Sequence, residues 1–126
     1  MRVAELVVAL YAERVSESDA VYIGLRGPQP AFGHGGPRVV GVREGSSHRT
    51  LRKHRDARTL PVEFEWGYEG AGPGVLAEAI LADRLGYNPD PVVTKAFERE
   101  VVARLEGEFE LPGSEVDDWL TAVLPR

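Results

Sequence analysis

A run with four glycines near the middle of the chain constrains the fold more than any other feature. Residues 66–74 read WGYEGAGPG, and an apolar segment, VLAEAIL, follows at once. Glycine permits tight turns and close backbone approaches that side chains obstruct. Proline suits the first turn of a helix, where its fixed φ fits and its missing N–H costs little. The run therefore predicts a strand end, a tight loop and a helix start, in that order.

Hydrophobic periodicity on either side of this run predicts an α+β fold. We expect a small three-stranded, mostly antiparallel sheet with an N-terminal helix and three C-terminal helices packed on one face. The expected elements are a helix over 2–16, strands over 20–26, 38–43 and 62–66, and helices over 73–85, 91–105 and 114–124.

Three local signals support these boundaries. The segment VEFEW at 62–66 alternates apolar and acidic residues, which is typical of a strand with one wet face. Gly86 is well placed to end the helix that starts at Pro73. Ser114 and Asp117 have the spacing of a capping box for the last helix.

The size and composition of the chain indicate one domain. We interpret residues 1–126 as a single domain, with a helical extension over 1–18 and a core over 20–124. The absence of cysteine excludes disulfides, zinc–thiolate sites and cysteine nucleophiles. No apolar run approaches the roughly 18 residues that span a bilayer, and Glu5 interrupts the N-terminal apolar stretch. We therefore expect no signal peptide and a cytoplasmic location.

One basic segment stands out in an acidic chain. Residues 43–58 hold six Lys or Arg against two acids, a net charge of +4, although the whole chain carries −5. Such a segment could contact phosphates of nucleic acid, or it could be a solvated loop that balances acidic neighbours. No aromatic residues are interleaved for base stacking. The candidate nucleic-acid residues are Arg43, Arg49, Arg52, Lys53, Arg55 and Arg58.

The C-terminal third is acidic in compensation. Residues 98–118 contain eight Asp or Glu against Arg99 and Arg104. These acids could form a partner-binding face, but the simpler interpretation is the wet side of two helices.

The glycine-rich run also raises the possibility of an anion site. Free amides at a helix start attract phosphate, but the run lacks the Lys-Ser/Thr of a P-loop. Pro73 removes one amide, and Glu69 would repel an anion. A structural role therefore competes with a small phosphate or nucleotide site. The candidate ligand-binding residues are Trp66, Tyr68, Gly70, Gly72 and His54.

No catalytic or metal constellation is evident. The three histidines, His34, His48 and His54, all fall in segments that read as loops, and no helical His-x-x-x-His pair occurs. Ser46, Ser47 and Thr50 lie near His48, but sequence proximity is not a triad. We expect no catalytic residue, no metal and no cofactor.

The stretch from Phe64 to Leu85 resembles a family of uncharacterised small proteins from prokaryotes, plasmids and phages. The family's hallmark is Trp-Gly-Tyr-Gly-Gly-Ser-Gly-Pro followed by a Leu-Ala-rich helix that ends near Leu-Gly. Here the matching residues are Trp66, Gly67, Tyr68, Gly70, Gly72, Pro73, Leu76, Ala77, Ile80, Leu81, Leu85 and Gly86. Similar flanks occur at Tyr22–Gly24, at Phe97–Val101 and at Trp119-Leu120, so the resemblance covers about residues 20–124.

The chain departs from this motif at two positions, with Glu69 where glycine is usual and Ala71 where serine is usual. The resemblance implies a fold and a mobile-element or accessory context, without an activity. We expect a non-enzymatic accessory protein that binds another protein or a second copy of itself. Nucleic-acid binding by residues 43–58 and ligand binding at residues 67–74 are the alternatives, and a hydrolase that uses His54 and an acid is a further one.

Overall fold

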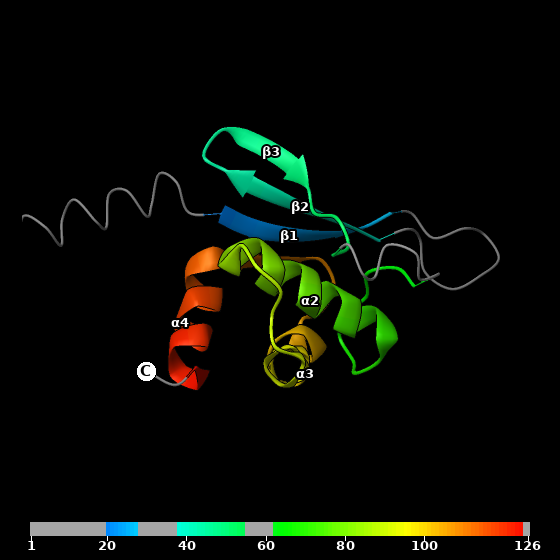
Figure 1. Cartoon of the computed structure of the whole chain (residues 1–126). Coiled ribbons are helices and arrows are strands. Elements are labelled where there is room, and N and C mark those ends of the chain that lie inside the picture. Colours follow the sequence, from blue (N-terminus) through cyan, green and yellow to red (C-terminus); the bar gives the residue numbers. More distant parts are fainter. Residues whose placement is uncertain (1–19, 28–37, 55–61, 125–126) are drawn as a thin grey trace, which may run out of the picture.

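An antiparallel sheet forms one layer of the computed structural model, which describes residues 20–27, 38–54 and 62–124. Within these ranges the sheet has four strands, in the spatial order β3-β2-β1-β4 (Figure 1). Their bounds are β1 Ala20–Arg26, β2 Arg38–Glu44, β3 Ser47–Thr50 and β4 Phe109–Pro112.

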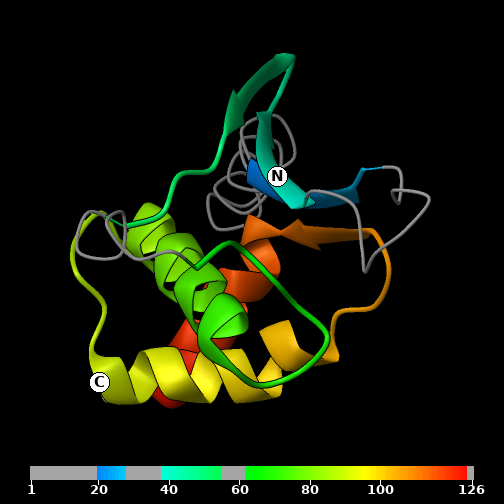
Figure 2. The same ribbon diagram turned by 90° about the vertical axis from the view of Figure 1, so that its right-hand side faces the viewer.

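The described residues form three α-helices, all on one side of this sheet (Figure 1). They are α2 (Ala71–Leu85), α3 (Pro91–Glu100) and α4 (Gly113–Val123), and a short 3₁₀ helix, η2 (Val102–Arg104), follows α3. In Figures 1 and 2, α2 lies between the sheet and α3. The α+β class agrees with the sequence-based prediction, but the details differ: the described sheet has four strands instead of three, and α3 packs on α2. The helix predicted over 2–16 lies outside the described residues.

The core lies between the sheet and α2. Alternate residues of each central strand face inward, because side chains of a strand point to opposite faces in turn. Tyr22 of β1 and Val42 of β2 are buried in this way. Helix α2 is buried along most of its length. Its fully enclosed residues include Leu76, Ala77, Ile80 and Leu81.

The predicted strand over 62–66 is wrong, since no strand forms there. The alternation in burial is nevertheless real: Phe64 and Trp66 are buried, whereas the Glu63 side chain is 82% exposed. Any extended segment alternates in this manner, but a strand also needs a hydrogen-bonded neighbour.

The sheet instead contains two strands that the sequence pattern did not predict. Strand β3 lies inside the basic segment, and all four of its residues are exposed. It pairs with β2 through a two-residue hairpin loop that begins with Gly45, at φ 60°, as such loops require. Strand β4 has only four residues and lies between helices, where it pairs with β1.

Several helix boundaries also differ from the prediction. Helix α2 begins at Ala71, two residues before the predicted start. Helix α3 ends at Glu100, since Val101 adopts φ −121° and ψ −61°, and η2 follows. Helix α4 begins at Gly113, directly after β4, with Pro112 in the capping position. The capping box predicted from Ser114 is therefore wrong. The helix end predicted at Gly86 is confirmed, because Gly86 adopts φ 80° and its N–H bonds to Ala82.

Candidate functional site

The glycine-rich run packs closely against its surroundings. Gly67 adopts φ 92° and donates its N–H to the Val102 carbonyl at 3.1 Å. A Cβ added at Gly72 would lie 2.7 Å from the Cβ of Glu65. The indole N–H of the buried Trp66 donates to the Gly107 carbonyl at 2.6 Å. Glycine is therefore needed here for a turn and for close packing of α2.

The N-terminus of α2 already has an anion beside it, which is the protein's own. The Glu98 carboxylate, only 3% exposed, accepts the Gly70 N–H at 2.9 Å. Lys95 approaches the same carboxylate at 3.3 Å. A phosphate at this helix start would therefore meet the negative charges of Glu98 and of the nearby Glu69, which lies 3.7 Å from Lys95.

The structure separates the five predicted ligand-binding residues. Gly70 and Gly72 lie at the first turn of α2, with Trp66 buried behind them. Tyr68 is 50% exposed and packs beside Gly70. His54 instead lines a hollow with Ala82, at the far end of the 15-residue helix. His54 and the glycine-rich run do not form one site.

Four of the six candidate nucleic-acid residues fall in the described part of the chain. Arg43 lies on β2, Arg49 on β3, and Arg52 and Lys53 follow β3. Lys53 donates to the Val62 carbonyl at 2.9 Å and lies 3.8 Å from Glu63. Arg52 is exposed and has no ion pair within the described ranges. Arg55 and Arg58 lie outside the described residues.

The side chain of Arg49 forms hydrogen bonds to two acidic residues of the protein itself. Its guanidinium forms two hydrogen bonds to Asp83 of α2, at 2.8 and 2.9 Å, and a third to Glu44 at 2.8 Å. The buried Tyr22 hydroxyl donates to the same Asp83 carboxylate at 2.6 Å. Asp83 therefore joins the inner side of β1 and β3 to α2, and Arg49 is neutralised.

This environment shifts the pKa values of two groups. Desolvation raises the pKa of Tyr22 above its usual range, and the hydrogen bond to Asp83 raises it further. Desolvation would raise the pKa of Asp83, but the hydrogen bonds from Arg49 and Tyr22 outweigh it, so the pKa lies below 3.8. The acid is therefore ionised and the phenol neutral over the ordinary pH range.

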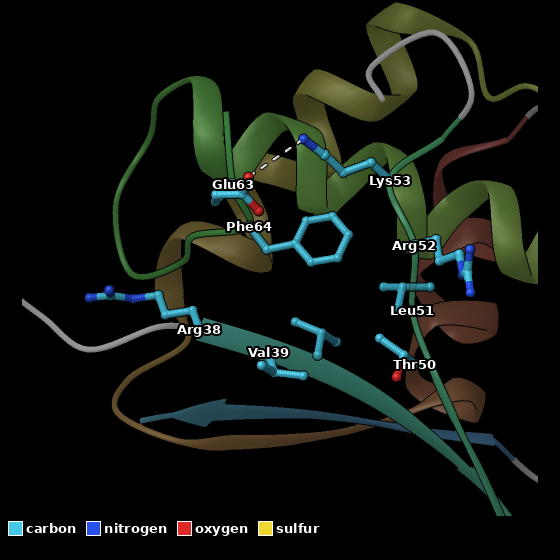
Figure 3. Close-up of a pocket in the computed structure, with 9 residues that line it drawn as sticks. Arg38, Val39, Thr50, Leu51, Arg52, Lys53, Glu63 and Phe64 are labelled. Carbon is cyan, nitrogen blue, oxygen red and sulfur yellow. Dashed lines mark ion pairs between the residues drawn. The ribbon is translucent and has the colours of Figure 1, made fainter. Parts of the chain in front are cut away.

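A hollow opens where the chain leaves β3 and diverges from β2. We call it the β2 hollow; its volume is about 520 Å³, and it is lined by residues 38–40, residues 50–53, Glu63 and Phe64. Figure 3 shows the Phe64 ring and Leu51 at its centre, with Arg38 and Arg52 on opposite sides. Arg38 is paired with Glu65 at 2.7 Å. The hollow thus combines an apolar floor with a partly neutralised basic rim.

A second depression lies on the other side of residues 50–53, against α2. It consists of two adjoining hollows. Both are lined by His54, Ala82 and Asp83. The Nε2 atom of His54 is buried and has no hydrogen-bond partner among the described residues. Asp83 is engaged by Arg49 and Tyr22, so it is not available as a partner acid for a catalytic histidine.

The sheet face opposite the helices carries an exposed aliphatic pair. Leu25 of β1 and Val39 of β2 are cross-strand partners, and each is 49% exposed. The alternate residues Val21 and Ile23 are half-buried on the same side of β1. No described element packs on this side (Figure 1). We call this surface the outer face.

The sequence pattern does not identify the groups that organise these contacts. Glu98 belongs to the acidic residues that we interpret as the wet side of two helices, and no pattern assigns a role to Asp83 or to the Tyr22 hydroxyl. Glu98 lies three residues before Val101, at the border of the apolar stripe of its helix, which was the one available signal. Tyr22 and Asp83 are 61 residues apart in the sequence, and no local pattern joins them.

The part of the chain that the structure describes contains neither a candidate metal site nor a candidate membrane-spanning helix. No group of three or more His, Cys, Asp or Glu side chains there is arranged to hold a metal ion. None of the described helices has the length and apolar character to cross a membrane.

Comparison with known proteins gives a family but no function. A model described as a family of unknown function (DUF6166) matches residues 22–122, which is well over half of the chain. The searches of curated proteins and of solved structures found no match to this chain.

Proposed function

The chain belongs to the family of unknown function DUF6166, and we propose that it is a non-enzymatic accessory protein that binds another protein through its outer face. The observation that carries this proposal is the exposed cross-strand pair Leu25 and Val39. Single exposed aliphatic residues are ordinary. A contiguous apolar surface on a sheet side that no described element covers is typical of an interaction site.

The β2 hollow adds to this surface. Val39 lies both on the outer face and at the lip of the hollow, whose floor includes Leu51 and Phe64. An apolar surface that continues into a depression offers an anchor point for a partner side chain, as the centres of protein interfaces do. The exposed Arg52 lies at the rim of the same depression.

The test is photo-crosslinking in cells that express the full chain with a photoreactive amino acid at position 25. The matched control carries the same group at Val92 of α3, which is 77% exposed on the helical side. We expect a discrete crosslinked protein from position 25 and not from position 92. Equal crosslinking from both positions, or none from position 25, would contradict the proposal.

Nucleic-acid binding by the basic segment is the second candidate, favoured by the exposed Arg52 next to Lys53. The pairing of Arg49 with Asp83 and Glu44 weakens this candidate, because the positive charge of Arg49 is already neutralised within the protein. Fluorescence anisotropy with oligonucleotides at about 50 and 200 mM salt tests it, because phosphate contacts weaken steeply with salt. Salt-sensitive binding that Arg52→Ala and Lys53→Ala reduce would favour this function.

A phosphate or nucleotide ligand at residues 67–74 remains the third proposal. The exposed Tyr68 ring beside Gly70 supports it, whereas the Glu98 carboxylate at the helix start opposes it. A titration with inorganic phosphate, followed by the amide resonances of Gly70 and Gly72, tests it. Unchanged resonances at millimolar phosphate would exclude this ligand.

We also propose that this accessory protein is cytoplasmic and is encoded in a mobile-element context. A cytoplasmic location is supported by the absence of cysteine from the sequence. A mobile-element context rests on the motif resemblance of residues 64–85. Fractionation of cells that express the native gene would test the location.

A further inference from the structure

The outer face has an apolar centre between two margins of opposite charge. The centre is β1, where Val21, Ile23 and Leu25 point away from the helices. On one side, Glu110 of β4 is the cross-strand neighbour of Ile23. On the other side, Arg43 of β2 is the neighbour of Val21. His48 of β3 lies next to Arg43 in the same row.

We propose that the outer face binds the outer face of a second copy of this chain. This inference rests on the proposed function and names the partner. The pattern is self-complementary: a twofold axis parallel to β1 places β1 over β1 and exchanges the two sides of the sheet. The acidic β4 margin of each copy then faces the basic β2 margin of the other.

The positions of the charges suit this arrangement. Glu110 lies in the row of Ile23, and Arg43 lies one row along the sheet, in the row of Val21. Adjacent rows on one face are about 7 Å apart along a strand. Both residues have long side chains, so each Glu110 reaches the Arg43 of the partner copy. The pair occurs twice, once on each side of the axis.

The surface also has room for interdigitation, which face-to-face sheets need at their spacing of about 10 Å. Gly41 of β2 is the neighbour of Ile23 on the outer face and presents no side chain there. An added Cβ at Gly41 would meet only the Arg49 carbonyl, at 3.7 Å. We assign the space above Gly41 to an aliphatic side chain of the second copy.

The dimer is expected to be weak, because the surface is small. A seven-residue strand is about 23 Å long, and four strands span about 15 Å. This area lies at the low end for specific protein interfaces, where association is transient. The equilibrium is therefore expected in the micromolar range and must be followed over a broad range of concentration.

Analytical ultracentrifugation of the full chain from about 1 to 500 μM tests the proposal. We expect a reversible monomer–dimer equilibrium that Leu25→Glu weakens by at least about tenfold, because two buried carboxylates would face each other. Val92→Glu is the matched control, and it should leave the equilibrium unchanged. Thermal melts of each variant establish that the fold is retained.

A charge exchange tests the orientation. Arg43→Glu alone and Glu110→Arg alone should each weaken the dimer, and the double variant should restore it, because the pair is reversed at both positions. A monomer at every concentration, a dimer insensitive to Leu25→Glu, or a double variant no better than the single ones would overturn the proposal.

The crosslinking test separates this inference from the proposed function. A crosslink from position 25 to a second copy supports both. A crosslink to a different protein, together with a monomer in the centrifuge, overturns the self-association and leaves the protein-binding function standing. No crosslink at all contradicts both.

Discussion

The Glu98 carboxylate on α3 accepts a hydrogen bond from the backbone N–H of Gly70, at the start of α2, at 2.9 Å. The four first N–H groups of a helix lack partners within the helix, and no side chain of the glycine-rich run caps this one. An acid from another helix does so instead. Its negative charge also lies near the positive end of the α2 dipole.

Replacing this acid should therefore destabilise the protein. We expect Glu98→Ala to lower the free energy of unfolding by about 1–3 kcal/mol, because the Gly70 N–H loses its partner. Glu98→Gln keeps an acceptor oxygen and should cost less. Urea unfolding measures both, with Glu106→Ala at an exposed loop position as the control. Equal stability of the Glu98→Ala and Glu106→Ala variants would contradict this role.

Gly24 of β1 should tolerate no side chain. A Cβ there would lie 2.1 Å from the ring of Phe109, its cross-strand partner. That ring is held edge-on against Trp66 at a centroid distance of 4.9 Å. We expect Gly24→Ala to cost about 1–3 kcal/mol of folding free energy through overpacking.

Gly41 of β2 provides the matched control for this substitution in chemical denaturation. A Cβ at Gly41 would meet only the Arg49 carbonyl, at an ordinary 3.7 Å. Gly41→Ala should therefore change the folding free energy by less than about 1 kcal/mol. If the two variants unfold at the same denaturant concentration, the close contact of Gly24 with Phe109 is not limiting.

Asp83 should make stability depend on acid pH. Its pKa in the folded state is below 3.8, so its contribution is complete above that value and is lost as the pH falls through the folded-state pKa. We expect the stability advantage of the wild type over Asp83→Asn to shrink below about pH 4. Unfolding followed between pH 2 and 6 measures this, with exposed Asp118→Asn as the control.

Tyr22 should make the stability of the folded protein depend on alkaline pH. Its pKa is raised above the ordinary 10.0, so its contribution is complete below pH 10 and is lost as the pH rises toward the folded-state pKa. Tyr22→Phe should cost about 1 kcal/mol at neutral pH and should flatten the decline above pH 10. Tyr87→Phe, at a side chain 63% exposed, should do neither.

Local patterns predicted side-chain burial better than hydrogen bonding. The alternation at residues 62–66 correctly placed Phe64 inside and Glu63 outside. It did not reveal that this segment lacks a neighbouring strand. The reverse holds for β3, whose four exposed residues have no apolar pattern and which forms because β2 offers a partner across a short hairpin loop.

The candidate sites were predictable only in part. The basic charge of residues 43–58 could be read directly, but the neutralisation of Arg49 by Asp83 joins residues 34 positions apart. The outer face could not be predicted, because the apolar residues of β1 occur on both sides of the strand. Which side the helices cover is a property of the packed structure.

The sequence by itself determined the α+β class, the two longest strands, the α2 helix and its glycine end, because these depend on periodicity and backbone freedom along contiguous residues. Only the tertiary structure decided the partners of the sheet, the anion at the start of α2 and the surface left open. Such features depend on contacts between distant segments, where desolvation and hydrogen-bond satisfaction outweigh local preference.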